Sequence, residues 1–265
     1  MRRFGLVLVS LIMLLAAVRW AGAQFQPVDM PDHESGMQRI QYTKSGEILY
    51  NMRWTTDKVV QGGRTLINYK LDGDNNKTGK ERIDWKEDGQ WEVLPAGIRS
   101  LYWLKKSTGA ENMTWNMKYD WKAHKAYFSF LDADSGKKEQ KTIELKGNSW
   151  TGDTINWQVR GFPFEKGPGA SINGQVVFPD GLVMDGSIVL IGEEKLDTPF
   201  GKLDTYKLEL KPTSAWLGLV APTMYLWCTK AEPHLWLRYD GRDEGPTKPR
   251  TKNFLMQYEP RTLIK

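Results

Sequence analysis

Residues 113–122 alternate between two kinds of side chain, and this pattern constrains the fold more than any other in the chain. Successive residues of a β-strand point to opposite faces, so the alternation predicts a strand with one apolar face. Large flexible and aromatic side chains on that face must cover something apolar, either a core helix or a bound ligand. The apolar set is Met113, Trp115, Met117, Tyr119 and Trp121.

Similar runs of period two recur along the chain, separated by turn-forming stretches such as Gly62-Gly63 and Pro179-Asp180-Gly181. The predicted fold class is all-β: about ten mostly antiparallel strands in a strongly curved sheet or open barrel, with one or two short helices. A short helix is expected at residues 154–160, with Asp153 as its N-cap. Residues 91–106 fit neither period and are expected to form a short helix or an irregular crossing strand.

The first 23 residues have the features of a secretory signal peptide. Arg2 and Arg3 precede an apolar run at residues 4–18, and Ala21-Gly22-Ala23 is a typical cleavage site. The run is shorter than the roughly 18 to 20 apolar residues of a spanning helix, which disfavours a membrane anchor. We expect no transmembrane anchor after cleavage. The expected location is the periplasm, or the medium if the cell has a single membrane.

The remainder is expected to form a flexible lead-in at residues 24–45 and a single β domain at residues 46–265. The lead-in is polar and contains scattered proline and glycine. Asp32, His33 and Glu34 within it are metal-ligand residue types, but adjacent side chains do not converge on one ion. A solvated tail is the favoured interpretation.

Charge and cysteine content exclude several classes of function. The formal net charge of +5 falls to +2 when Arg2, Arg3 and Arg19 leave with the signal peptide, so we expect no nucleic-acid partner. The only cysteine, Cys228, lies too far from the cleavage site for lipid attachment and has no partner for an internal disulfide. Its alternation with Met224 and Leu226 favours a buried structural thiol.

The second half of the chain has a characteristic order of features: an apolar strand at 189–191, Gly192-Glu193, the turn Thr198-Pro199-Phe200-Gly201, alternation at 206–211, a Trp-containing strand at 224–229, Pro233, and a strand ending in Arg238-Tyr239. This order resembles an exported bacterial family catalogued as domain of unknown function 3108. The resemblance extends upstream to residues 153–164, with the pattern Asp-x-x-x-x-x-x-Arg-x-x-Pro, and more weakly to residues 46–54. It implies an exported, mostly antiparallel β domain of unassigned role, and by extension a curved sheet like that of periplasmic lipoprotein carriers.

Catalysis has little support in the sequence. Only His33, His124 and His234 could serve as a general base, and no Gly-x-Ser-x-Gly motif accompanies them. Glu193 and Glu194 are adjacent on a strand, so their side chains point to opposite faces and cannot act as a pair. Phosphate-binding loops and Cys-x-x-Cys or His-x-x-x-His spacings are missing. We expect a protein that is not an enzyme and has no cofactor and no metal site.

Binding is the favoured class of function because eleven of the twelve tryptophans remain after signal cleavage. Tryptophans fill ordinary cores, line lipid cavities and stack on sugars, and the core interpretation keeps at least equal weight. Residues 216–222, with Gly218 and Pro222, could form a lid at the mouth of a cavity. The candidate ligand-binding residues are Trp115, Trp121, Trp216, Tyr225, Trp227, Trp236 and Arg238, with Arg238 sharing a face with Trp236 and lying near a headgroup.

Three functions remain open from the sequence. The leading hypothesis is a non-catalytic exported protein that binds an amphipathic ligand such as a lipid or glycolipid. The second is a structural or adaptor protein that binds an envelope protein partner through exposed aromatic or edge-strand surface. The third is a carbohydrate-binding or carbohydrate-active protein, which would require carboxylates that face tryptophans in a groove.

Overall fold

The computed structural model describes residues 24–213, 223–241 and 249–260. Within these residues the chain forms fifteen strands in one sheet and only short helices, which confirms the predicted all-β class. The strands are β1 (His33–Tyr42), β2 (Ile48–Gln61), β3 (Arg64–Asp74), β4 (Ile83–Leu94), β5 (Gly97–Gly109), β6 (Met113–Asp120), β7 (Lys125–Asp132), β8 (Lys138–Glu144), β9 (Ser149–Thr151), β10 (Ser171–Val177), β11 (Val183–Thr198), β12 (Gly201–Pro212), β13 (Met224–Thr229), β14 (Trp236–Gly241) and β15 (Thr251–Glu259). The helical elements are η1 (Gly79–Glu81), η2 (Gly152–Thr154), α2 (Ile155–Gln158), η3 (Val159–Gly161) and η4 (Phe164–Lys166).

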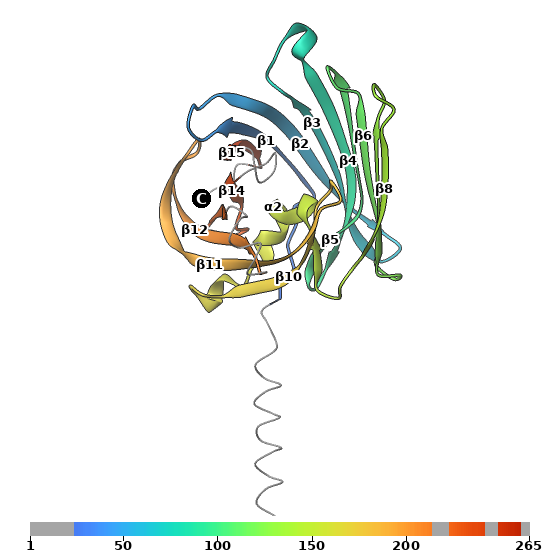
Figure 1. Cartoon of the computed structure of the whole chain (residues 1–265). Coiled ribbons are helices and arrows are strands. Elements are labelled where there is room, and N and C mark those ends of the chain that lie inside the picture. The colour runs from blue at the N-terminus through green and yellow to red at the C-terminus, as the bar shows by residue number, and fades with distance from the viewer. Residues whose placement is uncertain (1–23, 214–222, 242–248, 261–265) are drawn as a thin grey trace, which may run out of the picture.

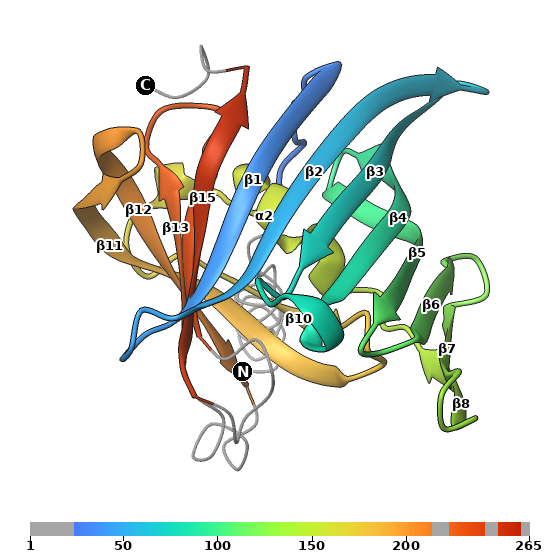
Figure 2. The same ribbon diagram turned by 90° about the horizontal axis from the view of Figure 1, so that it is seen from above.

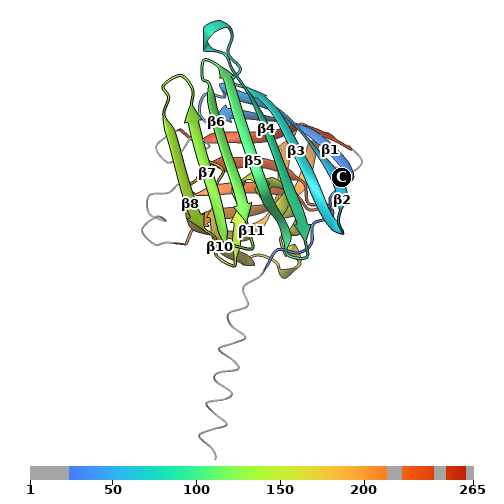
Figure 3. The same cartoon turned by 90° about the vertical axis from the view of Figure 1, so that its right-hand side faces the viewer.

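The strands form an open, strongly curved sheet (Figure 1). Its order is β8-β7-β6-β5-β4-β3-β2-β1-β15-β14-β13-β12-β11-β10-β9, so β1 pairs with β15 and strands from opposite ends of the chain lie side by side. Neighbouring strands are antiparallel except β9 and β10, which are parallel. β8 and β9 follow each other in the chain but form the two edges of the sheet. Figure 3 shows β2 to β8 side by side in one broad wall.

The side chain of Gln175 on β10 bridges the two edges of the sheet. Its Nε2 donates a 3.0 Å hydrogen bond to the carbonyl oxygen of Glu144, the last residue of β8. Its Oε1 accepts a 3.1 Å hydrogen bond from the backbone N–H of Lys146, whose ammonium pairs with Asp185 of β11 at 2.6 Å. A side-chain amide therefore makes, at this corner, the contacts that a backbone amide would make in a closed barrel.

The predicted count of about ten strands is wrong. The expected flexible lead-in contains β1, and residues 91–106 belong to β4 and β5, two regular strands joined by a tight turn. β1 and the strands at residues 91–106 were missed because their inward-pointing positions break the apolar alternation. On β1 the polar residues Glu34 and Gln38 point inward and are buried. Between Gln90 and Trp91 a bulge shifts the register of β4 against β5, which moves later side chains to the other face.

A helical run at residues 152–161 lies within the curve of the sheet (Figures 1 and 2). Its position agrees with the predicted helix, but Asp153 is not the N-cap. Thr151 and Thr154 occupy the cap positions of η2 and α2, and neither makes a side-chain capping bond. Asp153 is instead a buried carboxylate that accepts a 3.2 Å hydrogen bond from Trp91 Nε1. The run buries Trp157 and Val159 in the core.

Two apolar clusters hold the sheet together. The larger surrounds the helical run and draws on most strands, with Trp157 packed against Trp54 at 5.1 Å and Trp91 at 4.7 Å between ring centroids. The smaller joins β5 to β8 to the β10 side of the sheet, with Met117 and Phe128 packed against Val177. We call the sheet face that carries these clusters the inner face and the opposite one the outer face.

Trp54 lies over the backbone of Gly36, its partner on β1. A Cβ atom at Gly36 would come within 2.5 Å of the indole and 3.0 Å of the Gln257 carbonyl oxygen. Gly36→Ala is therefore expected to lower the free energy of unfolding by about 1 to 3 kcal/mol, measured by urea denaturation, because overpacking forces side chains or backbone to shift. Gly147→Ala is the matched control, since a Cβ there meets nothing within 4 Å. Equal stability of the two variants would contradict the close approach.

Candidate functional site

Trp227 and Trp236 lie on opposite faces of the sheet. Trp236 pairs with Cys228 and belongs to the inner face, where Cys228 is fully buried. Trp227, the residue before Cys228, points to the outer face and donates a 2.5 Å hydrogen bond to Glu194 Oε1. The two indoles are both nearly fully buried, but they do not line a common cavity.

The prediction that Arg238 shares a face with Trp236 is wrong. A bulge opposite Trp227 and Cys228 adds Leu237 to β14 as an extra, unpaired residue. Arg238 therefore pairs with Trp227 on the outer face. The Arg238 guanidinium carbon lies 4.2 Å from the centroid of the Trp227 ring, which Lys207 Nζ also approaches at 5.0 Å. These cations lie over the indole and leave it only 3% exposed. Arg238 also pairs with Asp240 at 3.3 Å.

The remaining predicted residues are spread over three places. Tyr225 is partly exposed beside Lys207 on the outer face, with 5.1 Å from the ammonium to the ring centroid. Trp121 stacks on Tyr119 at 5.8 Å and donates a 2.7 Å hydrogen bond to the Ser100 carbonyl, which fits a structural role in the smaller cluster. Trp216 and the expected lid at residues 216–222 fall outside the described residues. Trp115 belongs to the feature described next.

A row of aromatic side chains crosses the inner face from β2 to β7, and we call it the aromatic ladder. The ring centroids of Tyr50 and Trp85 lie 5.4 Å apart, as do those of Trp115 and Phe130. Lys105 connects the two pairs, because its Nζ lies 4.6 Å from the Trp85 centroid and 5.5 Å from that of Trp115. Neighbouring strands are about 4.8 Å apart, so the row is about 24 Å long.

β3 contributes a glycine to this row. Gly73 pairs with Trp85, and a Cβ there would lie 2.3 Å from the indole. The Trp85 ring therefore lies over the backbone of β3 and reaches Tyr50 on β2. Because glycine has no side chain, the Trp85 ring can occupy the space above β3, and the aromatic ladder continues across six strands.

The β6–β7 end of the ladder stays partly open, whereas Trp85 at its centre is buried. In the next row along β6 and β7, Met117 and Phe128 are buried together with Val177 of β10. Trp115 and Phe130 pack against that cluster but are only partly buried. An apolar surface with access to solvent therefore continues from the smaller core cluster.

The ladder carries one cation with unused hydrogen-bonding capacity. The Lys105 side chain is 29% exposed, and its Nζ lies 4.0 Å from Glu87 Oε1, beyond hydrogen-bond distance. Glu87 is more deeply placed and accepts a 3.1 Å hydrogen bond from Trp103 Nε1. Burial, followed by the charge of Glu87, raises the pKa of Tyr69 well above its ordinary value. The Lys105 ammonium can thus donate to an oxygen atom brought by a ligand.

The centre of the sheet holds a buried ion pair that the sequence did not reveal. Arg160 NH2 donates to Glu34 Oε2 at 3.0 Å, and the two side chains are 4% and 0% exposed. Glu34 also accepts hydrogen bonds from Trp157 Nε1 at 2.5 Å and from the Tyr258 hydroxyl at 2.7 Å. Burial raises the pKa of Tyr258, and the Glu34 carboxylate adds to that increase. Three segments that are distant in sequence, β1, the helical run and β15, meet at this carboxylate.

The adjacent residues Asp32, His33 and Glu34 diverge, as expected, but not as a solvated tail. His33 Nδ1 lies 2.7 Å from Asp57, and Asp32 pairs with Lys58 at 2.9 Å, while Glu34 is buried. Within the part of the chain that the structure describes, no three His, Cys, Asp or Glu side chains are grouped to hold a metal ion.

Cys228 is buried, as the sequence predicted. Burial raises the pKa of its thiol to about 12, and the charge of Arg160 opposes this shift. The thiol therefore stays protonated and unreactive at neutral pH.

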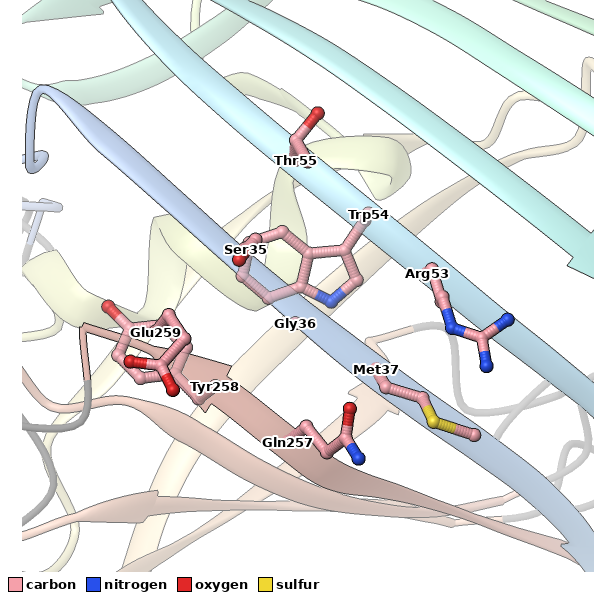
Figure 4. A pocket seen from close by; sticks show the side chains of 9 residues that line it. All are labelled: Ser35, Gly36, Met37, Arg53, Trp54, Thr55, Gln257, Tyr258 and Glu259. Atoms are coloured by element: carbon pink, nitrogen blue, oxygen red, sulfur yellow. The ribbon is translucent and has the colours of Figure 1, made fainter.

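A shallow groove of about 420 Å³ runs along the outer face of β1 between β2 and β15 (Figure 4). Met37 pairs with Arg53 and Ser35 with Thr55, so these side chains share the outer face, whereas Trp54 points inward. The lining combines polar side chains such as Arg53 and Glu259 with apolar surface from residues such as Met37, and the groove is open rather than enclosed. The lining residues are Ser35, Gly36, Met37, Arg53, Trp54, Thr55, Gln257, Tyr258 and Glu259.

The sequence matches the family described as "Protein of unknown function (DUF3108)" over residues 39–243. The chain belongs to this family. The match runs from within β1 to just past β14 and therefore includes the whole aromatic ladder and the helical run. No curated protein matches the chain.

Three solved structures are similar to this chain. A beta-barrel-like protein of domain of unknown function DUF1849 from Brucella abortus aligns with a TM-score of 0.50 at 9% identity, over 89% of this chain and 98% of that one. This likeness concerns the fold alone. A protein from Bacteroides fragilis described as exported, with a YmcC-like fold, gives 0.38 at 8% identity over 89% and 99%. A protein from Parabacteroides distasonis described as a lipoprotein gives 0.39 at 10% identity over 90% and 99%.

Among the described residues, no helix combines the length and the apolar character needed to cross a membrane.

Proposed function

We propose that this protein is a non-catalytic exported protein that binds an amphipathic ligand, a lipid or glycolipid, along the aromatic ladder. The single observation that carries the proposal is the ladder itself: a row of aromatic rings in which Tyr50, Trp115 and Phe130 are partly exposed and Trp85 is buried, with one lysine between two indoles. Export is inferred from the signal-peptide features of residues 1–23.

The ladder offers separate places for the two parts of such a ligand. Trp115 and Phe130 present apolar ring surface, on which an acyl chain gains about 25 cal/mol for each Å² of apolar area buried. Lys105 presents ammonium donors for a headgroup oxygen, and its partial burial between Trp85 and Trp115 strengthens that interaction relative to a fully solvated lysine.

The centre of the curved sheet is a poorer location for the ligand. The helical run fills it, and the cavity between Trp54, Arg160 and Trp236 has only about 10 Å³. A drug-sized or lipid ligand needs several hundred Å³. The sequence-based hypothesis of a lipid cavity is therefore replaced by an open surface on the wall formed by β2 to β7.

The adaptor hypothesis has less support from the described edges of the sheet. β8 is an edge strand, and its sequence is rich in lysine and glutamate at residues 138–144. Charged edge strands are the usual means by which proteins prevent pairing with another chain. We therefore keep protein binding as the second candidate.

Three variants of the mature chain, residues 24–265, test the proposal. Each is incubated with a bacterial envelope lipid extract, separated by gel filtration, and its bound lipid is measured after solvent extraction. Trp115→Ala and Phe130→Ala are expected to bind at least about tenfold less lipid, because each removes more than about 1.4 kcal/mol of apolar contact. Lys105→Gln is expected to lose anionic lipids selectively.

Tyr127→Ala is the matched control. Tyr127 lies on β7 but on the outer face, opposite Lys118, and is 45% exposed. It is expected to bind as much lipid as the wild type. Equal uptake by all four variants would contradict the ladder site, and circular dichroism of each variant separates loss of binding from loss of fold.

A further inference from the structure

The small interior cavity beside the Glu34–Arg160 pair is lined by three buried donors without partners. Trp54 Nε1, Arg160 Nε and Trp236 Nε1 make no hydrogen bond to the described residues, and all three residues are less than 9% exposed. The same three residues line a cavity of about 10 Å³ together with Gln38, Asn156, Trp157, Leu235, Leu255 and Tyr258. Three unpaired donors at one cavity call for an acceptor, because buried polar groups are nearly always hydrogen-bonded.

The geometry around Trp54 brings one of these donors toward the cavity. Its indole lies across β1 at Gly36, and in Figure 4 the ring nitrogen is on the side of Met37 rather than Ser35. The next inward-pointing residue of β1 in that direction is Gln38, which also lines the cavity. The Trp54 N–H is therefore on the cavity side of its ring.

An acceptor is present nearby as well. Asn253 Nδ2 donates a 3.2 Å hydrogen bond to Gln38 Oε1, while Asn253 Oδ1 is buried and has no partner among the described residues. Residues with unpaired N–H groups therefore line the cavity, and an unpaired amide oxygen belongs to Asn253, the hydrogen-bond partner of the lining residue Gln38. A molecule that both accepts and donates would complement it, whereas an anion would meet the Glu34 carboxylate nearby.

We infer that this cavity holds an internal water molecule that accepts hydrogen bonds from two of the three donors. A cavity of about 10 to 15 Å³ accommodates one water, and a buried water needs two to four polar partners. One water has two lone pairs, so it satisfies at most two of Trp54, Arg160 and Trp236. Its two hydrogens can be donated to amide oxygens such as Asn253 Oδ1.

The water would complete the polar centre that fixes the helical run to the sheet. Arg160 lies in η3, Trp54 on β2 and Trp236 on β14, so a bridging molecule joins the helical run to one or both of these strands. This inference is independent of the proposed ligand site, since the cavity and the aromatic ladder share no residue.

The test uses the wild-type mature chain, so that no variant has to fold. In NMR spectra of the ¹⁵N-labelled protein, the indole N–H of Trp54 or Trp236 is expected to show a direct cross-relaxation peak to water with the sign of a long-lived complex. Trp91 is the internal control, because its buried N–H donates to Asp153, it does not line the cavity, and it should show no such peak. A crystal structure at high resolution is expected to show one density peak within about 3.2 Å of two of the three nitrogens.

The inference is overturned if both indoles lack a water peak, or if the crystal structure shows an empty cavity. It is also overturned if Trp54 Nε1, Arg160 Nε and Trp236 Nε1 are found bonded to protein oxygens. A peak too large for water, or one that persists as a non-exchanging ligand, would likewise reject water as the occupant.

Discussion

Glu34→Ala is expected to lower the free energy of unfolding by about 3 to 5 kcal/mol, the usual cost of leaving a buried charge without its partner. The Arg160 guanidinium would remain buried without its carboxylate partner, while NH1 keeps a 3.6 Å contact with Met30 Sδ. Trp157 and Tyr258 would lose their acceptor at the same time. The change is measured by urea denaturation of the mature chain, followed by circular dichroism.

Two controls separate the buried charge from the general effect of a substitution. The double variant Glu34→Met with Arg160→Met is expected to be closer to wild-type stability than Glu34→Ala, because it removes both charges and keeps the volume. Asp185→Ala breaks an exposed pair with Lys146 and is expected to change stability by at most about 1 kcal/mol. If Glu34→Ala were no worse than Asp185→Ala, the buried pair would not be the organising contact of the core.

Asp153→Asn is expected to stabilise the protein at neutral pH and to have little effect at pH 4. Burial raises the pKa of Asp153 to about 6, although hydrogen bonds from Ser100, Thr151 and Trp91 oppose the shift. In the unfolded chain the pKa of this carboxyl has its ordinary value of 3.8. The folded state therefore binds this proton more tightly than the unfolded state does.

The sign of the pH dependence follows from that difference. Where the folded pKa is raised, the contribution to stability is fully present below the unfolded pKa and is lost as the pH rises through the folded pKa. The difference between a pKa of 3.8 in the unfolded chain and about 6 in the folded protein corresponds to about 3 kcal/mol of stability, lost mainly between pH 4 and pH 7. Asparagine mimics the protonated acid and removes this dependence.

The measurement is the difference in unfolding free energy between Asp153→Asn and the wild type at several pH values from 4 to 8. The difference is expected to grow with pH and then level off above about pH 7. Carboxylates such as Glu92, whose pKa the neighbouring Arg64 and Arg99 lower, titrate alike in both proteins and cancel. A difference that is constant with pH would show that Asp153 is ionised throughout or not buried.

Some parts of the fold could be predicted from the sequence because local pattern and tertiary structure agree there. β6 was predicted from its alternation, and Trp115, Met117 and Tyr119 do share the inner face. The turns at residues 62–63, 179–181 and 198–201 lie between strands as expected. In each case the residues that determine the structure are neighbours in the sequence.

Other parts could not be predicted because distant residues determine them. The inward carboxylate of Glu34 looked like part of a polar tail, and only the fold brings it to Arg160. The bulge at Leu237 separates Arg238 from Trp236, and no local pattern in β14 marks it. Lys105 lies in a run without a clear period, so its position between two indoles depends on the pairing of β4, β5 and β6.

Ligand binding at the aromatic ladder is tested most directly by native mass spectrometry of the mature wild-type chain, isolated from an envelope fraction and then extracted with solvent. The proposal predicts a reproducible added mass that extracts as lipid or glycolipid and that is lost in Trp115→Ala. A bare protein mass, with no uptake from an envelope lipid extract, would contradict the proposal. A stoichiometric protein partner in its place would favour the adaptor hypothesis.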